Sequence, residues 1–255
     1  MKAGSQSRAS SLARVLPRPI RAQHNAQPPL RAARHVVLHV IVIPGSIAVL
    51  AWVASSTGID HTVSNLFYDP ALAHFPAHDN FWLELFGHRL AKAAIWIVAF
   101  AVLAAALGAQ RLGLRNGDRR ALWIALLAMA FGPAIIYLLK HTTSHHCPWD
   151  LKVYGGFADA TFDWFVAPID AGRCFPSGHA SAGYSLVAIA FLGNAIDRPR
   201  WACGGLIAAV ICGAAFSIVR VMQGAHFVSH NLWSAAIDWC AAALVFTPLF
   251  FSANR

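Results

Sequence analysis

Three short segments of this chain combine the residue types that bind and cleave a phosphate ester. They occupy residues 140–149, 174–181 and 220–230. Lys140 and Arg220 supply positive charge, and an arginine guanidinium can hold phosphoryl oxygens in a bidentate manner. His179 and His226 can share the roles of nucleophile and general acid. The segments therefore predict phosphoryl chemistry, provided that the fold brings them together.

The composition shows what kind of element must position these segments. Of 255 residues, 57% are hydrophobic and only 12% are charged, with a mean hydropathy of +0.52. So little charge excludes an ordinary soluble enzyme and a disordered protein. A helix that crosses a bilayer needs about 20 largely apolar residues, and six such stretches occur, at residues 35–55, 91–109, 121–139, 175–193, 201–219 and 231–250. We therefore predict an all-α, six-helix transmembrane bundle over residues 35–255.

The distribution of basic residues predicts the orientation of this bundle. The chain has 20 Lys and Arg against 11 Asp and Glu, and residues 1–34 hold seven of the basic residues and no acidic one. This segment is predicted to be a disordered basic tail. Because cytoplasmic segments are enriched in Lys and Arg, we expect the tail and the loops 110–120 and 194–200 in the cytoplasm of a bacterial inner membrane. The segments with the candidate chemistry then lie on the periplasmic face.

Four basic residues lie on the predicted periplasmic side, although Lys and Arg are usually enriched on the cytoplasmic side. Binding of an anion is the first explanation to consider for them. They are Lys140, Lys152, Arg173 and Arg220. In addition, Ser177 and Gly178 open the fourth predicted span, where unpaired backbone N–H groups at a helix N-terminus favour an anion.

In order along the chain, the three segments resemble the signature of the type 2 phosphatidic acid phosphatase and vanadium haloperoxidase superfamily. That signature reads Lys-x6-Arg-Pro, Pro-Ser-Gly-His and Ser-Arg-x5-His-x3-Asp. The resemblance implies the membrane branch, with six spans and an active site at the outer face. It implies that His226 is the nucleophile that becomes a phosphohistidine, and that His179 protonates the leaving group and then activates water. It also implies no metal or cofactor, and phosphoryl oxygens held by Lys140, Ser177, Gly178 and Arg220.

Two departures from this signature bear on the chemistry. Cys147 stands where the first motif has Arg, and we expect Arg173 or Lys152 to replace that guanidinium. His230 stands where the third motif has the Asp that accepts a hydrogen bond from the nucleophile. A neutral His230 can accept this bond without a negative charge, so His226 should be a weaker nucleophile unless another carboxylate takes part. The candidate carboxylates are Asp150, Asp159, Asp163, Asp170 and Asp238.

The cysteines give a further hypothesis. Cys147 and Cys174 lie in one predicted periplasmic loop, next to two of the motifs. In this oxidising compartment a disulfide between them would close a loop of about 28 residues and contribute about 3–4 kcal/mol in the chain-entropy model. It would hold Pro148 near the Pro-Ser-Gly-His motif. The other cysteines fall in predicted spans and are expected to be packing residues.

These observations predict a metal-independent phosphatase that hydrolyses a phosphomonoester or pyrophosphate on a lipid. The expected partners are the lipid substrate and the membrane, with no nucleic acid and no obligate protein partner. Two alternatives use the same site, namely a phosphotransferase that passes the phosphoryl group between lipids (for example onto lipid A) and an impaired relative that only binds lipid phosphates.

Other classes of protein explain fewer residues. A transporter needs a polar path, and Asp238 is the ionisable residue well inside a predicted span. A haem protein needs a facing partner for His35 and His39, and none is evident. A zinc site is conceivable at His141, His145, His146 and Cys147. The phosphate site accounts for the residues that neighbour this cluster, and zinc does not.

Overall fold

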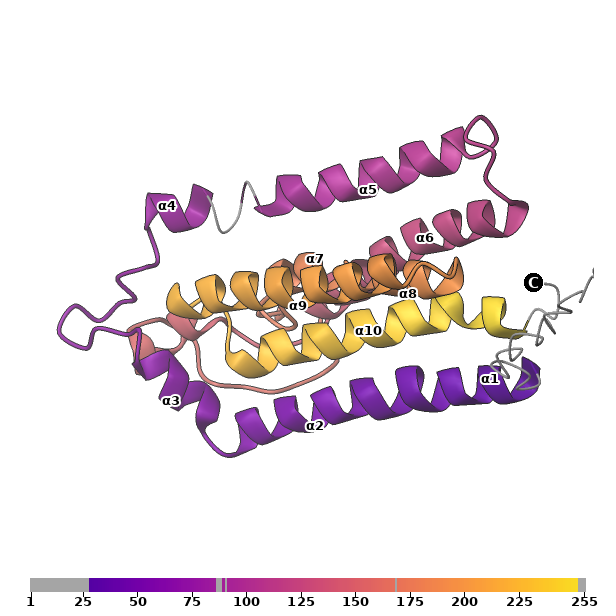
Figure 1. Cartoon of the computed structure of the whole chain (residues 1–255). Coiled ribbons are helices and arrows are strands. Elements are labelled where there is room, and N and C mark those ends of the chain that lie inside the picture. Colours follow the sequence, from indigo (N-terminus) through magenta and orange to yellow (C-terminus); the bar gives the residue numbers. More distant parts are fainter. Residues whose placement is uncertain (1–27, 86–88, 90, 168, 252–255) are drawn as a thin grey trace, which may run out of the picture.

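A computed structural model describes residues 28–85, 89, 91–167 and 169–251. Within these ranges the regular elements are all helices, as predicted, and they form an elongated bundle (Figure 1). The longer elements in chain order are α1 (Pro28–His35), the π-helix η1 (Val36–Val42), α2 (Ile43–Ser56), α3 (Ile59–Asn65), α5 (Ala91–Gly108), α6 (Asn116–Lys140), α7 (Gly178–Tyr184), α8 (Val187–Ala195), α9 (Pro199–Met222) and α10 (Val228–Phe251).

Shorter elements connect them. They are α4 (Phe81–Glu84) and the 3₁₀ turns η3 (Pro148–Asp150) and η4 (Lys152–Tyr154). Residues 1–27 of the predicted tail lie outside the described ranges, whereas its last residues, 28–34, already belong to the first helix.

Four helical stretches of the described chain are long and apolar enough to cross a membrane. They are Leu30–Ser56, Asn116–Lys140, Pro199–Met222 and Val228–Phe251. They correspond to the first, third, fifth and sixth predicted spans. The second predicted span is the shorter helix α5, and the fourth is divided between α7 and α8. The structure thus supports a multi-span membrane protein, while a count of six spans remains a proposal.

The division between α7 and α8 has a local cause. The hydroxyl of Ser185 donates to the carbonyl of Ala182 at 2.8 Å, which competes with the regular helical pattern. The backbone N–H of Leu186 donates to Gly183, three residues earlier, at 3.2 Å. Such i→i−3 bonds tighten a helix into a 3₁₀ turn. Helix α7 therefore ends at this turn, and the chain continues as α8.

Small residues allow the helices that carry the chemistry to approach closely. A methyl group on Gly183 of α7 would lie 2.5 Å from the backbone nitrogen of Gly213 in α9. Similarly, a methyl group on Gly132 of α6 would overlap the Asp238 carboxylate of α10. Close contact between small residues is the usual basis of helix association in membranes. These glycines let α6, α7, α9 and α10 form one packed unit.

The first helix packs along α10. Nε2 of His35 lies 3.0 Å from the carbonyl oxygen of Ala243, and its ring stacks on Phe250 at 4.1 Å. Pro44 lacks the N–H that would pair with the carbonyl of Val40, and that carbonyl accepts from the Cys240 thiol at 3.7 Å. His35 therefore has a packing partner in this structure, which agrees with a structural role.

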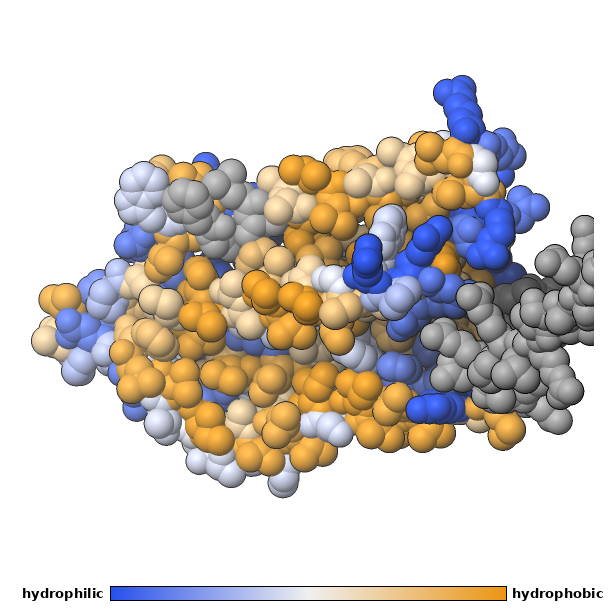
Figure 2. Space-filling model, in the orientation of Figure 1, coloured by the Kyte–Doolittle hydropathy of each residue, from blue (hydrophilic) through white to orange (hydrophobic). Residues whose placement is uncertain are grey.

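The surface separates an apolar flank from a basic end. Figure 2 shows apolar side chains over most of the long helices, with hydrophilic side chains gathered at the end where α1 begins. Exposed arginines at the turns between α5 and α6 and between α8 and α9 belong to this end, namely Arg111, Arg115, Arg120, Arg198 and Arg200. The opposite end carries the last residues of α6 and α9 and the first residues of α7 and α10.

Candidate active site

The end of the bundle opposite the basic arginines brings the three predicted segments together. Lys140 ends α6, Ser177 precedes α7, Arg220 lies near the end of α9, and His226 lies in the turn before α10. The rings of His179 and His226 have centroids 6.5 Å apart. Nζ of Lys140 lies 3.9 Å from the point where a Cβ on Gly178 would be. Residues far apart in the sequence therefore surround one small volume.

The turn before α10 fixes the position of His226. The backbone N–H groups of Ala225 and His226 both donate to the carbonyl of Arg220, at 2.8 and 3.3 Å. Gly224 adopts a left-handed conformation with φ +69°, and a Cβ there would lie 2.4 Å from the ring of Phe75. Only glycine fits this position. The turn thus holds the backbone of His226 against the end of α9, with 2% of the surface of His226 exposed.

Arg220 is held in a defined orientation. Its Nη1 donates to Oε1 of Gln223 at 2.9 Å, and its Cζ lies 5.5 Å from the centroid of a Trp149 ring. A guanidinium over an indole ring gains cation–π stabilisation. The backbone N–H of Trp149 in turn donates to Gly224 at 3.0 Å. Trp149, from segment 140–149, therefore helps to hold the side chain of Arg220, from segment 220–230, in place.

A third cation lies near Lys140 and Arg220. Lys92, at the start of α5, interacts electrostatically with both, and Glu84 of α4 interacts with Lys92 and Arg220. In the sequence, Lys92 stands at the outer end of the second predicted span, where lysines commonly extend to the interface, so its position alone does not indicate a role in the site. Its location next to two other cations becomes visible only when α5 is packed against α6.

The two basic residues expected to replace the missing guanidinium lie elsewhere. Arg173 is exposed in the loop before Ser177. Lys152 forms a surface ion pair with Asp159 at 2.7 Å. Neither is among the charges that act on Lys140 or Arg220 in the described chain. Lys92 is better placed than either to compensate for the charge that Cys147 does not supply.

The start of α7, which carries His179, is fixed to α10. The hydroxyl of Ser177 accepts from the N–H of Ala180 at 3.4 Å and so caps the helix. The hydroxyl of Ser234 donates to the Ser177 carbonyl at 2.9 Å. One turn further, Ser181 donates to Oδ1 of Asp238 at 3.2 Å. The intramembrane carboxylate thus braces the helix that holds His179.

His230 is buried between aromatic rings. Its ring centroid lies 5.2 Å from that of Phe175 and 5.6 Å from that of His145. It lies 5.9 Å from the His226 ring. The predicted hydrogen bond from His226 to His230 is not the one that forms, because Nδ1 of His226 instead lies 3.5 Å from Sγ of Cys174.

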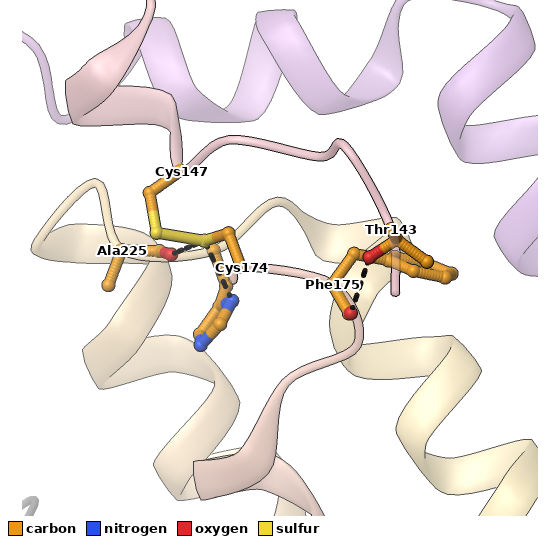
Figure 3. The surroundings of a disulfide bond; sticks show 6 residues. Thr143, Cys147, Cys174, Phe175 and Ala225 are labelled. Carbon is orange, nitrogen blue, oxygen red and sulfur yellow. Dashed lines mark hydrogen bonds between the residues drawn. A yellow bond between two sulfur atoms is a disulfide. The ribbon is translucent and has the colours of Figure 1, made fainter. Parts of the chain in front are cut away.

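That sulfur belongs to a disulfide. Cys147 and Cys174 are bonded, with their Cα atoms 5.1 Å apart, and Figure 3 shows the bridge beside Ala225. The bridge joins the loop after α6 to the loop before α7. It also lies next to the turn that carries His226, which cysteine spacing alone does not reveal.

The carboxylates proposed as substitutes for the motif's Asp do not act on His226. Asp150 is half-buried in η3, and Asp163 and Asp170 are exposed. Asp159 pairs with Lys152, and Asp238 bonds to Ser181. The charged groups that act on His226 within the described residues are all basic: Lys140, Arg220 and the neighbouring histidines.

Asp60 of α3 is a buried carboxylate that sequence reasoning missed. It accepts from the backbone N–H of Ser229 at 2.9 Å and from the Ser229 hydroxyl. A carboxylate at this position also suits the positive N-terminus of α10. Burial raises the pKa of Asp60 above its ordinary value, against the effect of these hydrogen bonds. In the sequence, Asp60 is marked only as an acidic residue shortly after the first predicted span, and this position alone does not predict a contact with Ser229.

Burial decides the protonation state of the nucleophile candidate. Desolvation lowers the pKa of His226 well below its ordinary value, and the positive charges of Lys140 and Arg220 lower it further. Burial also lowers the pKa of His145 to about 4. At neutral pH His226 is therefore an uncharged imidazole with a nitrogen lone pair available for attack.

One group of side chains has the spacing of metal ligands. Ligand atoms of Cys174, His226 and His230 lie within 4.8 Å of one another. A cysteine binds metal as a thiolate, and the sulfur of Cys174 is not a thiolate because it forms the disulfide with Cys147. The same bond removes Cys147 from the zinc cluster considered above. His141 in that cluster has its Nδ1 2.7 Å from the Tyr137 carbonyl oxygen.

Comparison with known proteins agrees with the motifs. The sequence model of the PAP2 superfamily matches residues 121–252, slightly more than half of the chain. This range includes each of the three segments in full. No curated protein and no solved structure gives a significant match to the chain.

Proposed function

Because this chain belongs to the PAP2 superfamily, whose members are phosphatases, we propose that it hydrolyses a lipid phosphate ester through a phosphohistidine on His226. The observation that carries this proposal is the pair of imidazoles of His179 and His226, 6.5 Å apart between Lys140 and Arg220. This spacing leaves room for one phosphoryl group between a nucleophile and an acid.

The proposed reaction has two steps. In the first, the Nε2 lone pair of His226 attacks phosphorus, a P–N bond forms, and the ester P–O bond breaks. His179 gives its proton to the leaving alkoxide. In the second, His179 takes a proton from water, the hydroxide attacks phosphorus, and the P–N bond breaks to release inorganic phosphate. Lys140 and Arg220 neutralise the equatorial oxygens throughout, with Lys92 as a third charge.

Several features support a lipid as the substrate. The flanks of the bundle are apolar, so the site lies on a molecule suited to a bilayer. An apolar cavity of about 300 Å³ lies between α3, α7, α9 and α10. Its lining includes Tyr184, Val221 and Leu232, and Val221 is the neighbour of Arg220. We propose that this cavity takes up part of the hydrocarbon chain of the substrate.

The orientation of the molecule follows from its basic end. We propose that the arginine-rich end faces the cytoplasm and that the site opens on the periplasmic side of a bacterial inner membrane. In this arrangement α5 and the α7–α8 pair complete six spans. Lipid headgroups of the outer leaflet then reach the site by lateral diffusion.

Phosphate release from purified protein tests this function. We expect release from at least one of a panel of lipid phosphomonoesters and pyrophosphates in detergent with excess chelator. His226→Ala should remove it, and His179→Ala should lower it by about 10²–10⁴-fold. His141→Ala is the matched control, because His141 lies at the same end of the bundle but bonds to its own helix.

The same assay separates the alternatives. Transfer of labelled phosphate to an acceptor lipid, without release, would identify a phosphotransferase. Binding without either reaction would identify an impaired relative. Release that survives His226→Ala would show that the proposed site is wrong.

A further inference from the structure

The sulfur of Cys174 occupies the position next to His226 where a hydrogen-bond partner of the nucleophile is needed. Sγ lies 3.5 Å from Nδ1 of His226 and 2.8 Å from the carbonyl oxygen of Ala225. Figure 3 shows the sulfur of Cys174 bonded to that of Cys147 and directed toward the carbonyl oxygen of Ala225. A disulfide sulfur carries no hydrogen, so the approach to Ala225 is a contact between sulfur and oxygen. Toward Nδ1 the sulfur can only accept.

We propose that Sγ of Cys174, held by the disulfide to Cys147, is the positioning group of His226 and replaces the Asp that the third motif has at residue 230. This inference rests on the proposed function of His226 as the nucleophile. Nδ1–H of His226 donates to the sulfur, and Nε2 is left with its lone pair directed to the phosphate site.

A group that positions His226 must also select the tautomer of its imidazole ring. A neutral imidazole carries one proton, and the hydrogen bond made by one nitrogen decides which nitrogen holds it. Attack through Nε2 requires the proton on Nδ1. A disulfide sulfur enforces this tautomer because it has no proton to give. A free thiol can also donate its S–H to Nδ1, which would leave the proton on Nε2 and block attack.

Burial and the surrounding hydrogen bonds hold Sγ of Cys174 and Nδ1 of His226 in contact. Cys174 is 0% exposed and His226 is 2% exposed, so water does not compete for Nδ1. The N–H of Cys174 donates to His145 at 3.2 Å, and Thr143 donates to the carbonyl of Phe175 at 3.1 Å. The other half of the bridge is tied to the turn that carries His226 by the bond from Trp149 to Gly224.

A sulfur acceptor also fits the electrostatics of the site. It fixes the ring without adding a negative charge, so it does not favour the protonated imidazole as an Asp would. His226 therefore stays neutral among the cations that bind the phosphate. The disulfide thus provides an uncharged hydrogen-bond acceptor for His226, in addition to making the loop more rigid.

Three variants separate positioning from loop rigidity. Cys147→Ala, Cys147→Ala/Cys174→Ala and Cys147→Ala/Cys174→Asp all lack the disulfide. At residue 174 they leave a thiol that can donate, no partner, and an acceptor, respectively. We expect kcat of the first two variants to be lower than that of wild type by at least about tenfold, as for other losses of tautomer control, with KM nearly unchanged. The variant with Asp should recover part of kcat although it has no bridge. Equal kcat in all three variants would mean that the bridge acts only through rigidity.

Nitrogen NMR of the intact wild-type protein tests the proposal without relying on a folded variant. In ¹⁵N-histidine-labelled protein at neutral pH, with His226 assigned from the signal lost in His226→Gln, we expect a protonated Nδ1 and an unprotonated Nε2. A dithiol reductant converts the bridge into two thiols and is itself oxidised to a disulfide, and the Nε2–H tautomer should then appear. An Nε2–H tautomer in the oxidised protein would overturn the positioning role. Failure of the proposed function would be recognised separately, as absence of phosphate release from wild type.

Discussion

His226 is the proposed nucleophile, and its electrostatic environment keeps it uncharged. Burial and the ammonium of Lys140 both lower the pKa of this imidazole. The nucleophile is active only when unprotonated, so activity should persist to a pH below the ordinary histidine pKa of about 6.5. The same positive charge that binds the phosphate thus also keeps the attacking nitrogen free of a proton.

Removal of the Lys140 charge should move the acid limb of the pH profile. In Lys140→Met the protonated form of His226 is less disfavoured, so the pKa of His226 rises. The acid limb of kcat/KM should shift to higher pH, and KM should rise because a phosphate-binding cation is lost. Profiles of kcat/KM from pH 4 to 9 measure both effects. Lys152→Met is the control, since its ion pair is on the surface, and a profile identical to that of wild type in Lys140→Met would contradict the coupling.

At the scale of elements, α3 and α10 are joined by one buried polar contact. Asp60 accepts twice from Ser229, the second residue of α10, three positions after His226. The contact fixes the beginning of α10 and therefore the turn in front of it. The same helix is tied to α7 through Ser234 and Asp238. The imidazole pair thus depends on how α10 is held by its neighbours.

Breaking the Asp60–Ser229 contact should loosen the site. We expect Asp60→Asn and Ser229→Ala each to lower stability by roughly 1–3 kcal/mol and to reduce kcat. The double variant should cost clearly less than the sum, because both changes remove the same interaction. Thermal unfolding in detergent and turnover measure the two effects. Asp79→Asn, in the exposed turn before α4, should leave both unchanged, and additive losses would argue against a direct coupling.

The whole molecule has two chemically different ends separated by an apolar flank. One end carries exposed arginines in the turns between helices, and the other carries the imidazoles, Lys140 and the disulfide. A disulfide persists in an oxidising compartment, and basic turns favour the cytoplasm. Both features favour the orientation proposed above, and they do so independently of each other.

Reporter fusions test this orientation. Alkaline phosphatase, which is active only in the periplasm, should be active when inserted after Asp79 and inactive when inserted between Gly113 and Leu114. Green fluorescent protein at the C-terminus should fluoresce, because α10 ends at the basic end. Active alkaline phosphatase at Gly113 would reverse the orientation, and with it the outer-leaflet source of the substrate.

The sequence by itself determined the superfamily of the protein and its character as a membrane protein. Apolar stretches long enough for a bilayer are local features, so they predict helices and a membrane without reference to packing. The order and spacing of Lys140, His179, Arg220 and His226 are also local, and they placed this chain in its superfamily. In the fourth predicted span, by contrast, the turn at Ser185 divides the helix for a reason that hydropathy does not register.

Only the tertiary structure decided the partners of these residues. Asp60 and Ser229 are 169 positions apart, and Cys174 and His226 are 52 apart. Such a pair forms because glycines let particular helices approach and because a turn aims a side chain, and both depend on the packing of the whole bundle. For this reason the sequence suggested His230 as the hydrogen-bond partner of His226, whereas Cys174 lies next to its Nδ1. Similarly, it suggested Arg173 as the replacement for the missing guanidinium, whereas Lys92 is better placed. The sequence was enough to propose the reacting groups, because motif order and spacing are local features. The groups that contact them depend on how the helices pack.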